Sequence, residues 1–325
     1  MSRLADSFGR RFHYLRLSVT EVCNFRCAYC LPDGWTRSAP LSFLSLEEVG
    51  RLLAAFTDLG LSKVRLTGGE PTVRRDIDAI IERVASTPGV AKTALTTNGW
   101  TLARRVRDWR RAGLNHLNVS VDSLDPEVFR RITGHDRLDE ILAGVDAALG
   151  LDFAAVKLNA VLLRDTADGF GAFAAFVRER PLSVRFIELM RTNDNADYFA
   201  RQHLGGQALR DWLDARGWQP LDRAFDAGPA IEYAHPDHAG RIGLIAPYAP
   251  GFCDSCNRLR VTARGKLRLC LFGEGGADLR DLLQSDDDRE ALVERIAVAL
   301  GAKTAGHRLH EGVSGDTRQL AEVGG

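Results

Sequence analysis

The chain has 325 residues, of which 45% are hydrophobic and 26% charged, as in an ordinary soluble globular protein. Basic and acidic residues balance at 43 each, so no global charge points to a nucleic-acid partner, and no apolar run is long enough to enter a membrane as a span. Residues 1–16 contain no secretory signal, which indicates a cytoplasmic, reducing location where the six cysteines would bind metal rather than form disulfides.

Short β-rich runs alternate with amphipathic stretches along the first two thirds of the chain. The predicted strands cover residues 14–19, 63–67, 92–97, 115–121, 156–162 and 183–188. The predicted helices cover residues 45–59, 76–85, 102–112 and 139–149, and the first begins with Ser45 as its cap and Glu48 three residues on. This alternation predicts a parallel sheet, either open or an incomplete barrel, that binds ligands at the carboxyl ends of its strands.

The alternation fades after about residue 191, where the second part of the chain begins. A helix is predicted near residues 207–216, followed by a Gly/Pro-punctuated stretch and a β-like segment over residues 259–269. We therefore expect a partial barrel over residues 1–220 and a carboxy-terminal region over residues 221–325.

Polar and cysteine-containing motifs follow the predicted strands. The first strand precedes a cysteine cluster, and later strands precede the segments 67–71 (TGGEP), 96–99 (TTNG), 120–123 (SVDS) and 188–190 (ELM). Because the carboxyl ends of parallel strands share one edge of the sheet, these motifs are expected to form one site.

The first cluster comprises Cys23, Cys27 and Cys30, close enough in sequence for one loop to bind three irons of a four-iron cubane. The fourth iron would remain open to the amino and carboxylate groups of S-adenosylmethionine. The alternatives are a structural zinc site, which needs a fourth ligand, or three unrelated thiols.

The second cluster comprises Cys253, Cys256 and Cys270. In isolation this spacing suggests a zinc site completed by His235 or His238. Beside a first iron-sulfur triad, we favour an auxiliary four-iron cluster whose open iron faces a substrate in the barrel.

Several basic residues stand in β-like segments. Arg258 and Arg260 would point to one face because side chains alternate along a strand, and their guanidinium groups could bind phosphates. Arg16, Arg65 and Lys157 lie in otherwise apolar strands, where a charge needs either a buried ion pair or an anionic ligand. We favour an anionic substrate in the barrel.

These motifs together carry a family resemblance that runs nearly end to end. The first triad, with Tyr29 before its last cysteine and the Gly68-Gly69-Glu70 segment, resembles the radical S-adenosylmethionine superfamily. The second triad, its NRLR extension over 257–260 and the terminal Gly324-Gly325 resemble the GTP 3′,8-cyclase family. The resemblance implies an α/β fold, an incomplete triosephosphate-isomerase-type barrel of six βα units with a carboxy-terminal extension that carries a second iron-sulfur cluster.

The resemblance also implies the chemistry. Two 4Fe-4S clusters and S-adenosylmethionine would be the cofactors, and GTP the substrate. A 5′-deoxyadenosyl radical would abstract hydrogen from the ribose C3′ of GTP, and the carbon radical would attack guanine C8 to give 3′,8-cyclo-7,8-dihydro-GTP, in the first step of molybdenum cofactor biosynthesis. The second cluster would bind the guanine ring.

By position, the resemblance assigns a role to each candidate residue. Cys23, Cys27 and Cys30 would be catalytic, as ligands of the radical-generating cluster. The residues expected to contact S-adenosylmethionine are Tyr29, Gly69, Ser120 and Met190. The residues expected to contact GTP are Arg16, Arg65, Thr96, Lys157, Arg258, Leu259 and Arg260. The terminal Gly324-Gly325 would enter the active site.

The implied partners are GTP, an electron donor of unknown identity and, by pathway, the downstream cyclic pyranopterin monophosphate synthase. A homodimer is compatible with the sequence, whereas nucleic-acid and membrane partners are not expected. The alternative function is another two-cluster radical enzyme, such as a peptide-modifying maturase, although those enzymes usually carry more than three carboxy-terminal cysteines.

Overall fold

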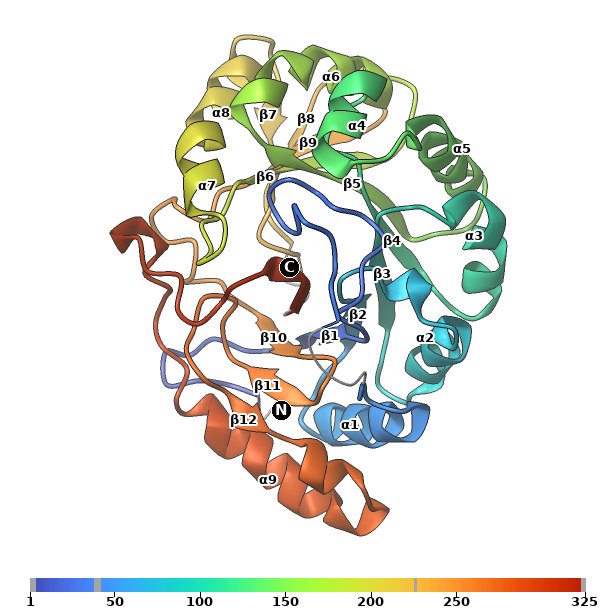
Figure 1. Ribbon diagram of the computed structural model, residues 1–325, viewed down its shortest axis with the longest axis vertical. Helices are drawn as coiled ribbons and strands as arrows, with labels where there is room; N and C mark the ends of the chain where they lie inside the picture. The colour runs from blue at the N-terminus through green and yellow to red at the C-terminus, as the bar shows by residue number, and fades with distance from the viewer. Residues whose placement is uncertain (1–3, 38–41, 225–226, 323–325) are drawn as a thin grey trace.

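The computed structural model describes residues 4–37, 42–224 and 227–322. Its strands form one sheet in the order β12-β11-β10-β1-β2-β3-β4-β5-β6-β9-β8-β7, which curves around a central space (Figure 1). Six strands, each paired in parallel with the next, are β1 (Tyr14–Ser18), β2 (Lys63–Thr67), β3 (Lys92–Thr97), β4 (His116–Ser120), β5 (Ala155–Leu162) and β6 (Ser183–Glu188). The predicted strands and the incomplete barrel are therefore confirmed, with strand ends within one residue.

The carboxy-terminal region extends this sheet at both edges. Strand β9 (Arg241–Ile245) pairs in parallel with β6, and β10 (Arg258–Val261) pairs in parallel with β1. The short antiparallel strands are β7 (Gln219–Pro220), β8 (Ile231–Ala234), β11 (Lys266–Arg268) and β12 (Ala277–Asp278). The β-like segment expected over residues 259–269 is confirmed as two strands, β10 and β11, which a turn separates. The division at residue 220 stays a prediction.

Helices surround the outside of the sheet (Figure 1). They are α1 (Leu46–Asp58), α2 (Ile77–Ser86), α3 (Leu102–Arg111), α4 (Pro126–Thr133), α5 (Leu138–Leu149), α6 (Phe170–Val177), α7 (Ala196–Gln202), α8 (Gln207–Asp214) and α9 (Arg289–Leu300). The predicted cap of α1 is confirmed, since the Ser45 hydroxyl accepts from the Glu48 amide (3.2 Å) while the Glu48 carboxylate accepts from the Ser45 amide (2.7 Å). Helices α4, α6 and α7 were not predicted from the sequence. Among the described helices, none is long and apolar enough to span a membrane.

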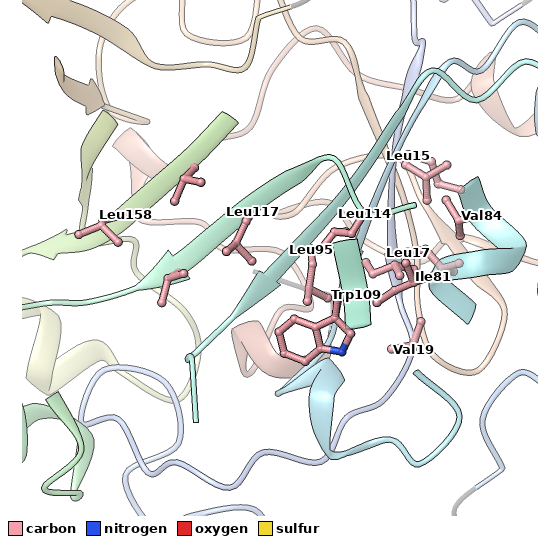
Figure 2. Packing of buried hydrophobic residues seen from close by; sticks show 14 of the residues in the cluster. Leu15, Leu17, Val19, Ile81, Val84, Leu95, Trp109, Leu114, Leu117 and Leu158 are labelled. Atoms are coloured by element: carbon pink, nitrogen blue, oxygen red, sulfur yellow. The ribbon is translucent and has the colours of Figure 1, made fainter. Parts of the chain in front are cut away.

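The hydrophobic core lies between the sheet and the helices. Leu15 and Leu17 of β1 pack there with residues of α2 and with Trp109 of α3, and all three side chains are almost fully buried (Figure 2). Because side chains alternate along a strand, Tyr14 and Arg16 must then point to the opposite face, into the barrel. The same alternation that builds the core therefore places polar residues inside.

Candidate functional site

A cavity of about 400 Å³ lies inside the barrel. Seven arginines and four lysines line it, against two carboxylates among the described lining residues, Asp222 and Glu232. The basic residues are Arg16, Lys63, Arg65, Lys92, Lys157, Arg185, Arg223, Arg241, Arg258, Arg260 and Lys303. Since the whole chain is electrically balanced, this local excess of positive charge indicates an anionic ligand.

Strand register gathers these cations into rows. Arg16 of β1 lies beside Arg65 of β2 on one side and Arg260 of β10 on the other. One layer away, Tyr14 lies between Lys63 and Arg258 in the same way. Parallel pairing of three strands thus brings together residues separated by almost 250 positions in the sequence.

Burial and mutual repulsion disfavour the charged forms of the arginines in this cavity. Burial, with the charges of Arg65 and Arg258 adding to it, lowers the pKa of Arg16 to about 10. Burial and the charge of Arg65 likewise lower the pKa of Arg185 to about 10. Both shifts disfavour the charged form, and a bound polyanion would reverse them.

Six of the lining cations were not singled out in the sequence: Lys63, Lys92, Arg185, Arg223, Arg241 and Lys303. Lys63 could have been found, because it stands two residues before Arg65 on the same strand face. Arg185 of β6 donates to Asn159 (2.7 Å), and Gly243 opposite it leaves room, since a Cβ there would lie 2.9 Å from Arg185 Cγ. Arg223 and Lys303 lie outside the strands, where no periodic pattern marks them.

Three predicted GTP-contacting residues have other contacts. Lys157 lines the cavity but donates to Glu232 (2.9 Å), so the buried ion pair considered for this lysine is present alongside its position facing the ligand space. The Thr96 hydroxyl accepts from Arg65 (3.1 Å) and thereby holds that guanidinium. The side chain of Leu259 is buried in the hydrophobic core, so only its backbone could face a substrate.

Tyr14 is expected to be ionised near neutral pH in the substrate-free protein. Burial opposes ionisation, but the charges of Arg65, Arg16 and Lys63 outweigh it and lower the Tyr14 pKa to about 6. The pKa values of the other tyrosines, Tyr29, Tyr198, Tyr233 and Tyr248, are raised. Tyrosinate absorbance in an ultraviolet difference titration should therefore appear with a midpoint of about 6 and vanish in Tyr14→Phe. Its absence below about pH 8 would contradict this electrostatic description.

The loop of the first triad runs alongside the glycine segment that follows β2. The Val19 amide donates to the Thr67 carbonyl (3.0 Å), the Gly69 amide to the Thr20 carbonyl (3.0 Å), and the Glu70 amide to the Val22 carbonyl (2.8 Å). A Cβ on Gly69 would lie 2.5 Å from the Val22 oxygen. Glycine is therefore required here for close approach to the backbone leading into Cys23.

Glu70 is a structural residue of the site that the sequence analysis left without a role. Its buried carboxylate accepts from the Thr97 hydroxyl (2.7 Å) and from the amides of Asn98 (2.6 Å) and Thr72 (3.0 Å). Asn98 in turn donates to Asn24 in the first cysteine loop (2.8 Å). Glu70 thus joins the ends of β2 and β3 to that loop.

The residues expected to contact S-adenosylmethionine come from four strand ends. The Tyr29 hydroxyl donates to Asp122 just beyond β4 (3.0 Å), and Ser120 is the last residue of β4. Met190 follows β6 and lines the cavity. Together with Gly69 beyond β2, they lie around the first cysteine loop at the carboxyl edge of the sheet.

The six thiols fit iron-sulfur ligation. Burial, with the charges of the other thiols of the same triad adding to it, raises the pKa of Cys23, Cys27 and Cys253, and all six cysteine side chains are half-buried. Burial raises the pKa of Cys23 to about 12, a shift that bonding to iron would offset. Over the described residues, no group of three or more His, Cys, Asp or Glu side chains is arranged to hold a single metal ion. A cubane instead spreads three thiolates over three irons.

All three cysteines of the second triad line the cavity, together with His307. Burial opposes ionisation of Cys256, but the charges of Arg258 and Lys303 outweigh it and lower its pKa. His235 and His238, considered above as zinc ligands, contact each other (3.1 Å) and the ring of Trp218. The second triad is therefore built into the wall of the cationic cavity, whereas Gly324 and Gly325 lie outside the described residues.

Two family profiles match the chain. The Radical SAM superfamily matches residues 17–177, and Molybdenum Cofactor Synthesis C matches residues 182–309. Among solved structures, Streptococcus suis SuiB bound to S-adenosylmethionine has a TM-score of 0.61 at 14% identity, covering 88% of this chain and 68% of that one. This last likeness concerns the fold alone.

Sequence relatives are similar over their whole length. A GTP 3′,8-cyclase of Stenotrophomonas maltophilia is 58% identical over 326 residues, covering 100% of both chains. A GTP 3′,8-cyclase of Aeromonas hydrophila subsp. hydrophila is 52% identical, covering 100% of this chain and 97% of the relative. With both triads in place and the cationic cavity between the sheet edges, the chain belongs to the GTP 3′,8-cyclase family of the radical S-adenosylmethionine superfamily.

Proposed function

We propose that this chain converts GTP to 3′,8-cyclo-7,8-dihydro-GTP, the first step of molybdenum cofactor biosynthesis. Cys23, Cys27 and Cys30 would hold a 4Fe-4S cluster, which would provide the electron for reductive cleavage of S-adenosylmethionine into methionine and a 5′-deoxyadenosyl radical. On GTP, the 5′-deoxyadenosyl radical takes the hydrogen from ribose C3′, that carbon bonds to guanine C8, and guanine N7 gains one electron from the external donor and one proton to give the 7,8-dihydro product. The chain's own residues must hold both reactants and exclude water.

The observation that carries this proposal is the cavity itself, where an excess of cations meets the second cysteine triad. A triphosphate would neutralise the rows around Arg16, Arg65 and Arg260, and guanidinium groups bind phosphate oxygens in pairs. The guanine would then lie toward Cys253, Cys256 and Cys270, the second cluster's ligands. Met190, from the S-adenosylmethionine side, borders the same space.

The individual roles are part of the same proposal. Tyr29, Gly69, Ser120 and Met190 contact S-adenosylmethionine. Arg16, Arg65, Lys157, Arg258 and Arg260 contact the phosphates of GTP, while Thr96 acts through Arg65 and Leu259 through its backbone. An external electron donor reaches the first cluster, the downstream synthase takes the product, and the enzyme works in the cytoplasm. Assembly as a homodimer is compatible with this scheme.

Anaerobically reconstituted protein should bind about eight irons, in two four-iron clusters. It should form 5′-deoxyadenosine with GTP and not with ATP, because the guanine must reach the second triad. Iron analysis and chromatography of the nucleosides measure both quantities. Equal turnover with ATP would exclude GTP as the specific substrate.

A matched pair of cysteine variants separates the two clusters. Cys27→Ala should lose about four irons and all 5′-deoxyadenosine. Cys270→Ala should also lose about four irons, yet retain binding of S-adenosylmethionine while losing the cyclised product. If Cys270→Ala cyclised GTP normally, the second triad would have only a structural role.

A further inference from the structure

The segment over residues 314–317 lies between two loops of the site (Figure 1, red). It contacts the loop after β6, where the Asn193 amide donates to the Thr317 carbonyl (3.1 Å) and Asn193 Oδ1 accepts from the Ser314 hydroxyl (2.7 Å). Asn193 Nδ2 also donates to the Gly315 carbonyl (3.1 Å). These bonds fix the segment to the end of the barrel that carries Met190.

The same segment is held on its other side by the loop of the second triad. The Thr317 hydroxyl donates to the carbonyl of Leu271, the residue after Cys270 (2.5 Å), and Thr317 is only 2% exposed. Gly315 packs so closely that a Cβ there would lie 2.6 Å from the Gly273 carbonyl oxygen. The segment over residues 314–317 therefore connects the loop after β6 to the loop after Cys270, with close contacts at both ends.

The loop after β6 is tied in turn to the loop of the first triad. Asn195 is buried, and its Nδ2 donates to the carbonyls of Tyr29 (3.3 Å) and Met190 (3.0 Å). Its Oδ1 accepts from the Thr192 amide (2.8 Å), which orients the side chain. Hydrogen bonds thus run from Tyr29, beside Cys30, to Leu271, beside Cys270.

We propose that Asn193 and Asn195, with Ser314 and Thr317, form a clamp that fixes the first cysteine loop relative to the second. Asn195 and Thr317 are its buried positioning residues, and neither belongs to the described lining of the cavity. The inference rests on the proposed function, in which one loop generates the radical and the other holds its target. Misplacing reacting groups by about 1 Å can reduce a rate about a hundredfold, so this spacing matters.

Thr317→Val tests the clamp, because valine has a similar shape and lacks the hydroxyl, and Thr317→Ser keeps the hydroxyl. In Thr317→Val we expect faster hydrogen–deuterium exchange over residues 271–276, and about tenfold less product per 5′-deoxyadenosine. Misplaced radicals would be quenched by an electron from the reductant and a proton from solvent. In the same variant, the binding of GTP and S-adenosylmethionine and the rate of 5′-deoxyadenosine formation should change less than about twofold. Thr317→Ser should restore the coupling of the reaction, that is, the amount of product formed per 5′-deoxyadenosine.

Asn195→Ala should uncouple the reaction in the same way, with faster exchange in the first cysteine loop. Asp194→Ala is the matched control, because its exposed carboxylate is held by long contacts to Arg318 and Gln319 (3.4 Å each) and its loss should leave coupling unchanged. Wild-type coupling and exchange in Thr317→Val would overturn the clamp, as would failure of serine to restore them or loss of iron from the valine variant. Failure of the proposed function is distinguishable, because wild-type protein would then make no product from GTP.

Discussion

Replacing Gly69 with alanine should weaken binding of S-adenosylmethionine and slow formation of 5′-deoxyadenosine about a hundredfold. The added Cβ would lie 2.5 Å from the Val22 oxygen and 2.7 Å from the Glu21 oxygen. Both are backbone atoms and cannot rotate away, so the strain falls on the residues leading into Cys23. We expect the free energy of unfolding to fall by about 1–3 kcal/mol, as in other overpacked sites. Calorimetric titration measures the binding of S-adenosylmethionine, chromatography measures the formation of 5′-deoxyadenosine, and chemical denaturation measures the free energy of unfolding.

Gly171 in α6 is the matched control for the added methyl group. No atom lies within 4 Å of a Cβ placed there, so Gly171→Ala should leave cofactor binding unchanged and stability equal or slightly higher. The second cluster should survive in Gly69→Ala, because its ligands lie in another loop. Normal binding of S-adenosylmethionine by Gly69→Ala would mean that the two backbones separate easily at this point, contrary to the observed contacts.

The barrel strands could be predicted because they are short β-rich runs that alternate with amphipathic stretches. Helix α4 was missed although its signals are present, since Asp125 caps the Val128 amide (2.9 Å) and Pro126 occupies the first turn. The parallel pairing of β9 with β6 and of β10 with β1 could not be predicted from the sequence of either strand. Such pairing joins segments distant in the chain, and periodicity carries no information about which strands become neighbours.

The site was predictable where chemistry depends on local spacing. The first cysteine triad lies within one loop, whereas β10 and β11 separate Cys270 from the other two cysteines of the second triad. The period of two correctly placed Arg258 and Arg260 on one face. Arg223 and Lys303 reach the cavity from outside the strands, so only the folded chain shows their proximity. The clamp residue Thr317 depends on contacts with two distant loops, and nothing in its own neighbourhood distinguishes it.

Replacing Arg260 with methionine should affect stability and GTP binding in opposite directions. Arg260 is 8% exposed, and burial together with the charges of Arg16 and Arg258 lowers the pKa of its guanidinium well below the usual range. Its environment therefore disfavours the charged form unless an anion is bound. An apolar side chain of similar length removes that penalty, so the substrate-free variant should unfold at the same or a higher temperature than the wild type.

Addition of GTP should reverse this order. A hydrogen bond between a guanidinium and a phosphate contributes about 1.5–3 kcal/mol, so the affinity of Arg260→Met for GTP should fall about 10- to 100-fold. Because a ligand that binds only the folded state stabilises it by RT ln(1 + [ligand]/Kd), GTP at one concentration should raise the melting temperature of the wild type more than that of the variant. Arg289→Met, which removes an exposed ion pair with Asp58, should change neither quantity much. Loss of iron from Arg260→Met would instead assign this arginine to support of the second cluster, since phosphate binding alone requires no change in the metal content.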